Sequence, residues 1–380
     1  MNQQVYLDNA ATTKIADAVK AEMEPYLKEN YGNASTSYSI GAEAKRAIEK
    51  AREMIAETLC AKPSEIYFTS GGSESDNWAI KGVAGDNKKK GRHIITSSIE
   101  HHAVLNSCEY LEQLGYHVSY LKPDSNGIIS PESVQDALHQ DTTLITIMYG
   151  NNEVGTVEPI MQIGKIAKAH GIVFHTDAVQ AYAQIPLSMM QLPVDLLSAS
   201  SHKFHGPKGV GFLYVREGVN VPSFIHGGGQ ERGKRAGTEN VAGIVGMGKA
   251  AELAHINMRR RIQKEIMLRN YMIERVLHEI PNARLNGHSS MRLPGNVNFS
   301  FKGIEGASLL MLLEEDGICA SGGSACNTGG NRISYVIEEL GVPKEYAPGT
   351  VRFTMCGDTT KEEIDVTIES LKKNVARLTL

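Results

Sequence analysis

The sequence has few cysteines and no long hydrophobic run, and both absences exclude classes of protein. None of the five cysteines forms a C-x-x-C pair, so neither a disulfide framework nor a zinc ribbon is expected. No uninterrupted apolar stretch is long enough to span a bilayer, and the N-terminus lacks the basic and apolar regions of a secretory signal. These absences predict a protein of the reducing cytoplasm that does not insert into membranes.

An excess of positive charge is also missing. The 39 Lys and Arg residues against 43 Asp and Glu residues give a net charge of -4, so a nucleic-acid partner is not expected. The only basic run, Lys88-Lys89-Lys90, is typical of a solvated loop. A chain of 380 residues, 41% hydrophobic and 22% charged, is ordinary for a globular protein and long enough for more than one domain.

The hydrophobic pattern predicts an α/β fold. Short β-branched or aromatic runs at 66–69, 93–96, 117–121 and 144–148 alternate with helical spacing at 103–114 and 131–139. This alternation favours a mainly parallel sheet covered by helices on both faces. An amphipathic helix is expected over 44–59, and a long, broken helical stretch over 241–280. After Pro281, an alternating segment at 297–301 and a final helix over 361–380 indicate a smaller α+β domain.

An acid and a lysine follow two expected strands. Asp177 comes after the apolar run 171–174, and Lys203 comes after the run 194–199. Polar residues at the carboxyl ends of strands in an open α/β sheet face the binding crevice. Pyridoxal phosphate (PLP) needs an amine for a Schiff base and a carboxylate that keeps its ring nitrogen protonated. The pair therefore indicates a PLP enzyme, although Asp177 alone could be a helix N-cap and Lys203 alone a surface lysine.

Two further segments suit that cofactor. Gly71-Gly72-Ser73 follows the expected strand at 66–69 and opens a helix, where backbone N–H groups can bind a phosphate. Alone, such a motif is more typical of a simple turn. His101 also begins a helix after a strand, and it could stack on a planar ring or be structural. Its neighbour His102 points in another direction, so a pair of metal ligands is not expected.

Cys326 stands apart from the other cysteines. It lies between Gly322-Gly323 and Gly329-Gly330, and a glycine-rich segment is costly to order. A lone cysteine is more often a buried small hydrophobe, but a cysteine in a flexible polar loop is more typical of a reactive thiol. The surroundings of Cys60, Cys108 and Cys319 are apolar or helical, which indicates structural cysteines, and Cys356 is left open.

Taken together, these motifs resemble the cysteine desulfurases of the NifS/IscS type, class-V aminotransferases of PLP fold type I. The similarity runs nearly end to end, through residues 6–13, 32–33, 74–77, 100–101, 151–155, 201–209, 235–240 and 323–326. It implies an aspartate-aminotransferase-like PLP-binding large domain at 14–255. It also implies a small domain from 1–13 and 256–380, which carries the cysteine loop at about 320–332. Gly-Ser-Ala-Cys in a long glycine-rich loop resembles the NifS/IscS branch rather than the SufS branch.

The resemblance also implies a role for each matching residue. Lys203 would form the Schiff base, His101 would stack on the ring, and Asp177 would hold the ring nitrogen. The remaining implied contacts are Asn152 and Gln180 near the ring hydroxyl, Gly72, Ser73, Ser200 and His202 at the phosphate, Thr238 at the phosphate of the partner in a homodimer, and Asn33, Asn152 and Arg352 at the substrate carboxylate.

The implied reaction is that of a sulfurtransferase. L-cysteine would give L-alanine and a persulfide on Cys326, and the sulfur would pass to an acceptor or an iron-sulfur scaffold protein. No resident metal is implied, although Cys326 could transiently share an iron-sulfur cluster with a scaffold. The sequence departs from the family pattern at Gly72-Ser73, at Tyr38 and at residues 355–358.

Two other functions compete with this reaction. One is a PLP enzyme that does not use a thiol, such as an aminotransferase or a selenocysteine lyase. The other is a non-catalytic scaffold for iron-sulfur assembly.

Overall fold

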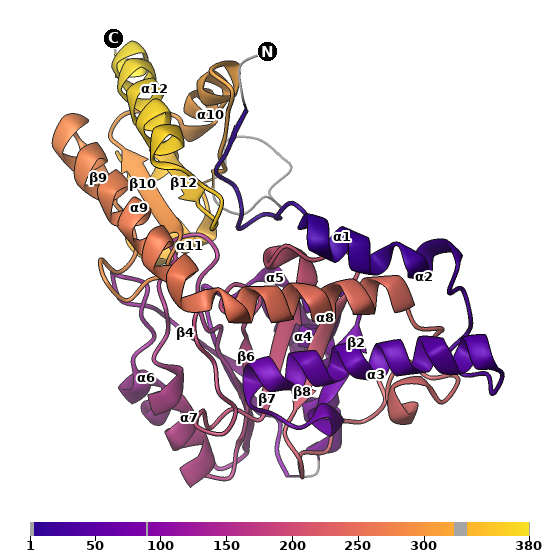
Figure 1. Ribbon diagram of the computed structural model, residues 1–380. Helices are drawn as coiled ribbons and strands as arrows, with labels where there is room; N and C mark the ends of the chain where they lie inside the picture. Colours follow the sequence, from indigo (N-terminus) through magenta and orange to yellow (C-terminus); the bar gives the residue numbers. More distant parts are fainter. Residues whose placement is uncertain (1–3, 89, 323–332, 380) are drawn as a thin grey trace.

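The computed structural model describes residues 4–88, 90–322 and 333–379. Its largest sheet has seven strands in the order β2-β8-β7-β6-β5-β3-β4 (Figure 1). The strands are β2 (Ile66–Thr69), β3 (His93–Ser97), β4 (His117–Leu121), β5 (Thr142–Thr146), β6 (Val173–Asp177), β7 (Leu196–Ser200) and β8 (Gly211–Val215). Strands β4, β3, β5, β6 and β7 pair in parallel, and β8 pairs antiparallel with β7 and β2. The predicted mainly parallel sheet is confirmed.

Both faces of this sheet are buried, each under a hydrophobic cluster of its own. Neighbouring residues of a strand point to opposite sides, so they join different clusters. Leu197 and Phe212 join one hydrophobic cluster, while Leu196 and Leu213 join another. The first cluster lies under α3 (Ser39–Leu59), α7 (Ile160–Ala169) and α8 (Val241–Ile256), and the second under α4 (Gly72–Asp86) and α5 (His102–Gln113). Figure 1 shows α3 and α8 side by side across the front of the sheet, with α1 (Asp17–Met23) and α2 (Pro25–Lys28) beside them.

One expected helix is shorter than the sequence indicates. The helix expected over 131–139 is α6 (Pro131–Asp136), with Ser130 as its N-cap. The chain then turns, since the amide of His139 donates to Thr142 Oγ1 and the amide of Thr142 donates to the carbonyl of His139. This turn uses the last residues of the expected helix to start β5.

The C-terminal third forms a second group of elements, drawn in orange and yellow at the top of Figure 1. Strand β10 (Asn296–Phe301) lies between β9 (Ala283–Leu285) and β12 (Thr350–Thr354), antiparallel to both. Helices α9 (Met258–Glu279), α10 (Gly306–Glu315) and α12 (Lys361–Thr379) pack on this sheet, and α11 (Tyr335–Glu339) lies apart from them in another small cluster. The helical stretch expected over 241–280 breaks at Asn257, between α8 and α9, as predicted.

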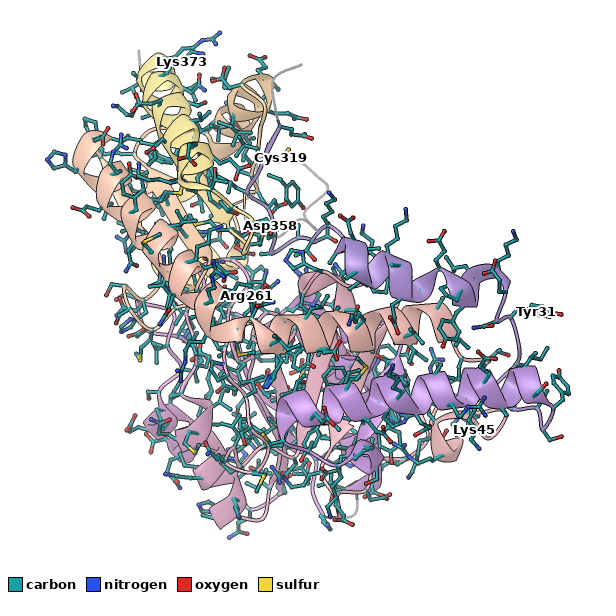
Figure 2. The ribbon with its side chains drawn as sticks, viewed as in Figure 1. Tyr31, Lys45, Arg261, Cys319, Asp358 and Lys373 are labelled. Carbon is teal, nitrogen blue, oxygen red and sulfur yellow. The ribbon has the colours of Figure 1, made fainter. Side chains whose placement is uncertain are left out.

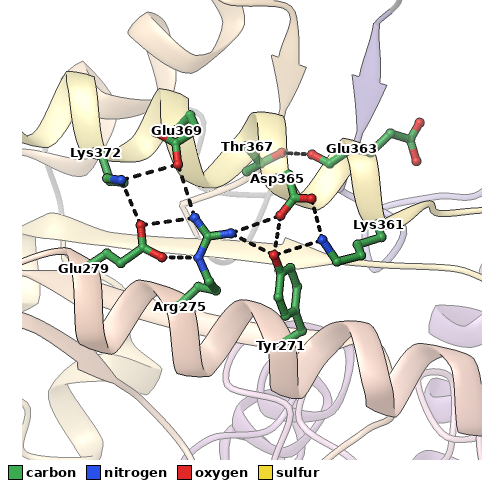
Figure 3. Close-up of polar contacts among 9 residues, drawn as sticks. All are labelled: Tyr271, Arg275, Glu279, Lys361, Glu363, Asp365, Thr367, Glu369 and Lys372. Carbon is green, nitrogen blue, oxygen red and sulfur yellow. Dashed lines mark hydrogen bonds and ion pairs between the residues drawn. The ribbon is translucent and has the colours of Figure 1, made fainter.

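A network of charged side chains joins α9 to α12 (Figure 3). Arg275 on α9 pairs with Glu279 on the same helix and, across the gap, with Asp365 at 3.0 Å and Glu369 at 3.2 Å. Lys372 of α12 reaches back to Glu279 at 2.8 Å. Exposed pairs contribute at most about 1 kcal/mol each, so this network orients the two helices more than it stabilises them.

The second group of elements is tied to the large sheet at several points. Arg261 lies near the start of α9 (Figure 2). It donates to the side chain of Gln184 at 2.8 Å and to the carbonyl of Ala183. The N-terminal strand β1 (Val5–Tyr6) pairs in parallel with β11 (Ile318–Cys319) before the chain crosses to α1. Within the described ranges, no helix is both long enough and apolar enough to cross a membrane.

Candidate functional site

A cavity of about 320 Å³ opens where β6 and β7 end. This volume is in the range of small-molecule sites, and the carboxyl ends of strands are where such sites form in open α/β sheets. Most of the expected site residues line the cavity: Gly72, Ser73, His101, Asn152, Asp177, Gln180, Ser200, His202, Lys203 and Arg352. The fold therefore gathers residues from distant parts of the sequence, from Ala10 to Arg352.

Lys203 crosses the cavity toward the N-terminal segment. It ends a short 3-10 helix, η2 (Ser201–Lys203), that directly follows β7. Its Nζ donates to the carbonyl oxygens of Ala10 at 2.6 Å and Ala11 at 2.9 Å. Gln180 donates to the same carbonyl of Ala10 at 2.9 Å. Residues 10 and 11 thus form one wall of the site, although they lie far from it in the sequence.

Asp177 is buried at the end of β6. Its Oδ1 accepts from the amide of Val179 at 2.8 Å, and residues 179–184 form turns rather than a helix, so the N-cap interpretation is wrong. Burial raises the pKa of Asp177, while the nearby His101 and Lys203 act to lower it. A buried carboxylate needs a cationic partner to stay ionised, and a protonated ring nitrogen has that character.

His101 is the N-cap of α5. Its Nδ1 accepts from the amide of Ala103 at 3.1 Å, so the neutral ring carries its proton on Nε2. Burial, together with the charge of Lys203, lowers its pKa and favours this neutral form. His102 instead packs its ring edge-on against Tyr335, with 5.0 Å between the ring centroids. The two histidines therefore point in different directions, as expected from the sequence. His101 also lies close to two acidic residues. A ring nitrogen of His101 and one carboxylate oxygen from each of Asp76 and Asp177 lie within 4.8 Å of one another.

The start of α4 offers an anion site. A Cβ on Gly72 would lie 2.5 Å from Cγ2 of Val179, so a side chain there would force Val179 to shift, and no side chain caps this helix in the described part of the chain. Ser73 and Ser200 add hydroxyl groups to the cavity lining. Burial and neighbouring lysines lower the pKa of His202 to about 4, so it is neutral at pH 7 and can donate one N–H. A helix N-terminus with these donors fits a phosphate group.

Arg352 on β12 reaches the cavity from the second group of elements. It is only 2% exposed, and its Nη1 donates to the carbonyl of Asn152 at 2.8 Å. Asn33 and Thr238 are both exposed, and neither lines the cavity formed by the described residues.

Cys326 falls outside the described residues. Cys60, expected to be structural, is exposed at the C-cap of α3, whereas Cys108 is buried.

The sequence did not reveal a polar layer beneath the cavity. Glu100 is fully buried, accepts from Ser97 Oγ at 2.6 Å and from the amide of Met148 at 2.9 Å, and burial raises its pKa to about 8. His175 lies between hydroxyls of Thr146 and Ser198, 3.6 Å from Asp76, and burial lowers its pKa to about 3. One signal was available, because His175 and Asp177 alternate along β6 and so share a face.

Comparison with known proteins identifies the family. Residues 5–366 match the family model described as aminotransferase class-V. A cysteine desulfurase IscS of Dictyoglomus turgidum is 51% identical over 378 residues, which cover 100% of this chain and 96% of that protein. The chain belongs to the cysteine desulfurases. A cysteine desulfurase IscS of Methanosarcina thermophila is also 51% identical, over 99% of this chain and 93% of that protein.

Solved structures agree with this membership. A NifS-like protein superposes with a TM-score of 0.93 at 39% identity, covering 99% of this chain and 100% of the other. A structure described as SspA in complex with cysteine has a TM-score of 0.83 at 38% identity, covering 94% of this chain and 100% of the other. Cysteine desulfurases are PLP-dependent enzymes, so the expected fold class, enzyme class and cofactor are confirmed, and a non-catalytic scaffold is disfavoured.

Proposed function

We propose that Lys203 is the amine to which PLP binds in this desulfurase, and that Cys326 receives the sulfur of L-cysteine. The observation that carries the proposal is the shared cavity at the ends of β6 and β7, which Lys203 and the buried carboxylate of Asp177 both line. An amine and an acid are the two groups that this cofactor requires of its protein.

The other lining residues are assigned by their chemistry. Asp177 holds the ring nitrogen and His101 stacks on the ring, while Asn152 and Gln180 lie near the ring hydroxyl. Gly72, Ser73, Ser200 and His202 bind the phosphate through backbone N–H groups, hydroxyls and one imidazole N–H. Because Thr12 Oγ1 lies 3.2 Å from Nδ1 of His202, its hydroxyl can donate to that nitrogen and leave Nε2–H for the phosphate.

The reaction needs a base and a nucleophile. When bound, PLP supplies an electron sink that weakens the bonds at the substrate Cα. The Lys203 amine removes the Cα proton. The Cys326 thiolate attacks the substrate sulfur, so that an S–S bond forms as the C–S bond breaks. The electron pair of the C–S bond stays on Cβ, which takes up a proton. Lys203 then returns the proton to Cα, and L-alanine leaves. Arg352, which lines the cavity, holds the substrate carboxylate.

A homodimer completes the assignment. Thr238 is exposed outside its own cavity, in a loop fastened to α4 by the ion pair of Arg235 with Glu74 at 2.8 Å. We place Thr238 at the phosphate of the partner subunit. The outer sulfur of the persulfide then passes to a sulfur acceptor or an iron-sulfur scaffold protein. We place this transfer in the reducing cytoplasm, which keeps the Cys326 thiol free.

The proposal divides the chain into two domains. The large domain comprises 14–255, and the small domain comprises 1–13 and 256–380.

Cys326→Ser tests the role of the nucleophile. The variant should bind PLP and L-cysteine normally but lose sulfide release, because a serine hydroxyl is a poor nucleophile toward sulfur. Mass spectrometry of the wild type after L-cysteine and before reductant should find one added sulfur on the peptide that contains residue 326. The exposed Cys60 provides the matched control, and Cys60→Ser should keep full activity. An added sulfur on Cys319 or Cys356 would contradict the assignment.

A further inference from the structure

Arg352 already holds a carboxylate that belongs to the protein. Its Nη2 donates to Asp8 Oδ1 at 2.7 Å, and the two side chains are only 2% and 17% exposed. Its Nη1 is taken by the carbonyl of Asn152. The buried Nε has no hydrogen-bond partner among the described residues. A guanidinium binds a carboxylate best through two parallel bonds, and Asp8 makes one.

Asp8 is held beside Arg352 by the backbone around it. Residue 8 forms a bridge with Thr354, two positions after Arg352 on β12. The amide of Thr354 donates to the carbonyl of Leu7 at 2.7 Å, and the side chain of Asn9 donates to the carbonyl of Thr354 at 2.7 Å. The carboxylate is therefore fixed in register with the arginine. Because Arg352 also lines the cavity, an incoming carboxylate would meet a guanidinium that is half engaged.

We propose that Asp8 is a specificity-determining residue, an internal carboxylate that occupies part of Arg352 until the amino-acid substrate displaces it. The inference rests on the proposed function of Arg352 as the receptor of the substrate carboxylate. A ligand that offers both oxygens to Nε and Nη2 gains the second bond that Asp8 does not make. A ligand without a carboxylate cannot offset the loss of the ion pair between Asp8 and Arg352. This ion pair therefore lowers the affinity of the site for every ligand that displaces Asp8, and it lowers the affinity for ligands without a carboxylate most.

Removing the charge of Asp8 should therefore tighten substrate binding. In Asp8→Asn, an amide oxygen can still accept from Nη2, but the buried guanidinium lacks its counter-charge. An uncompensated buried charge destabilises the folded protein, and a ligand carboxylate restores the balance. If Asp8 only held Arg352 in position, Asp8→Asn would have the opposite effect, because a less well positioned Arg352 would bind the substrate more weakly.

The test uses the holoenzyme and L-alanine, the product, as a carboxylate ligand that has no sulfur to transfer. Calorimetry should show that the Kd of L-alanine falls about tenfold in Asp8→Asn, which corresponds to about 1.4 kcal/mol, and the KM of L-cysteine should fall with it. The Tm without ligand should drop, and saturating L-alanine should raise it by more than in the wild type. Asp8→Glu keeps the charge, so its Kd should not fall.

Asp316→Asn is the matched control. Asp316 accepts from Ser370 at 2.7 Å and Asn374 at 2.9 Å in the small domain, so this variant should lose stability without a change in Kd or KM. An unchanged or raised Kd in Asp8→Asn overturns the proposal, as does an insoluble variant that L-alanine fails to rescue. If wild-type protein makes no alanine from L-cysteine, the proposed function fails instead, while the L-alanine titrations still test the pair.

Discussion

Lys203 donates from its Nζ to the carbonyl oxygen of Ala10 at 2.6 Å, which joins the end of β7 to the N-terminal segment. The same segment presents Asp8 to Arg352. Residues 8–11 therefore lie between the amine assigned to the cofactor and the guanidinium assigned to the substrate. Under the proposed assignments, both of those side chains exchange partners within the protein when ligands bind, so this segment would take part in each binding step.

Replacing Lys203 should remove the covalent link to the cofactor. Lys203→Ala should lose turnover and the visible absorbance of covalently held PLP, while the phosphate contacts and Asp177 still bind the cofactor. Borohydride reduction followed by peptide mapping should label residue 203 in the wild type. Lys208 is the matched control, because it is exposed five residues further on, and Lys208→Ala should keep the label and the activity. A label on Lys208 would contradict the assignment.

A shared active site predicts complementation between two inactive variants. Lys203→Ala and Thr238→Ala subunits should each be impaired, since a hydrogen bond to a charged group contributes about 1.5–3 kcal/mol. In a mixed dimer both defects fall in one site and the other site is intact, so co-expressed subunits should regain activity. Mixed dimers with no regained activity, or a fully active PLP-loaded monomer in sedimentation, would refute the shared site.

The strand-end positions of the site were predictable because they depend on local pattern. A buried strand followed by Asp177, and a second followed by Lys203, needed only the apolar runs before them to be placed at the same sheet edge. The helix N-terminus that we propose for the phosphate could be predicted in the same way, because Gly72 follows β2 and begins α4. These residues are positioned by the element that carries them.

The contacts made by the N-terminal segment could not be predicted in this way. Ala10 and Ala11 bind Lys203 through backbone carbonyls, which every residue type has, so no side chain marks them. The pair of Asp8 with Arg352 spans 344 positions and depends on how two separate sheets meet. Glu100 could not be predicted for another reason. A charged residue is expected at the surface, whereas Glu100 is fully buried and accepts hydrogen bonds from Ser97 and Met148.

Glu100 should make stability fall with rising pH. Burial raises its pKa to about 8, from 4.5, so the folded protein holds a proton that the unfolded chain releases in that interval. The contribution of this group to the free energy of unfolding therefore decreases between those two values, by at most about 1.4 kcal/mol per pH unit. Glu100→Gln is neutral throughout, so its Tm relative to the wild type should rise from about pH 5 to about pH 8. The exposed Glu314 is the control, and Glu314→Gln should track the wild type. Parallel curves for Glu100→Gln would show that this carboxyl is ionised in the folded protein.

Arg352 should determine the use of L-cysteine through the geometry of its fork. Charge-assisted hydrogen bonds contribute about 1.5–3 kcal/mol each, so Arg352→Ala should lower kcat/KM by at least about tenfold. The variant also leaves Asp8 without its cation, and the repulsion between Asp8 and the substrate carboxylate should add to the loss. Arg352→Lys keeps the charge but not the two parallel donors, so it should rescue only part of kcat/KM. Adding Asp8→Asn to Arg352→Ala should recover the part that repulsion causes, whereas the exposed Arg377→Ala should leave kcat/KM unchanged. A wild-type kcat/KM in either Arg352 variant would exclude this arginine as the carboxylate receptor.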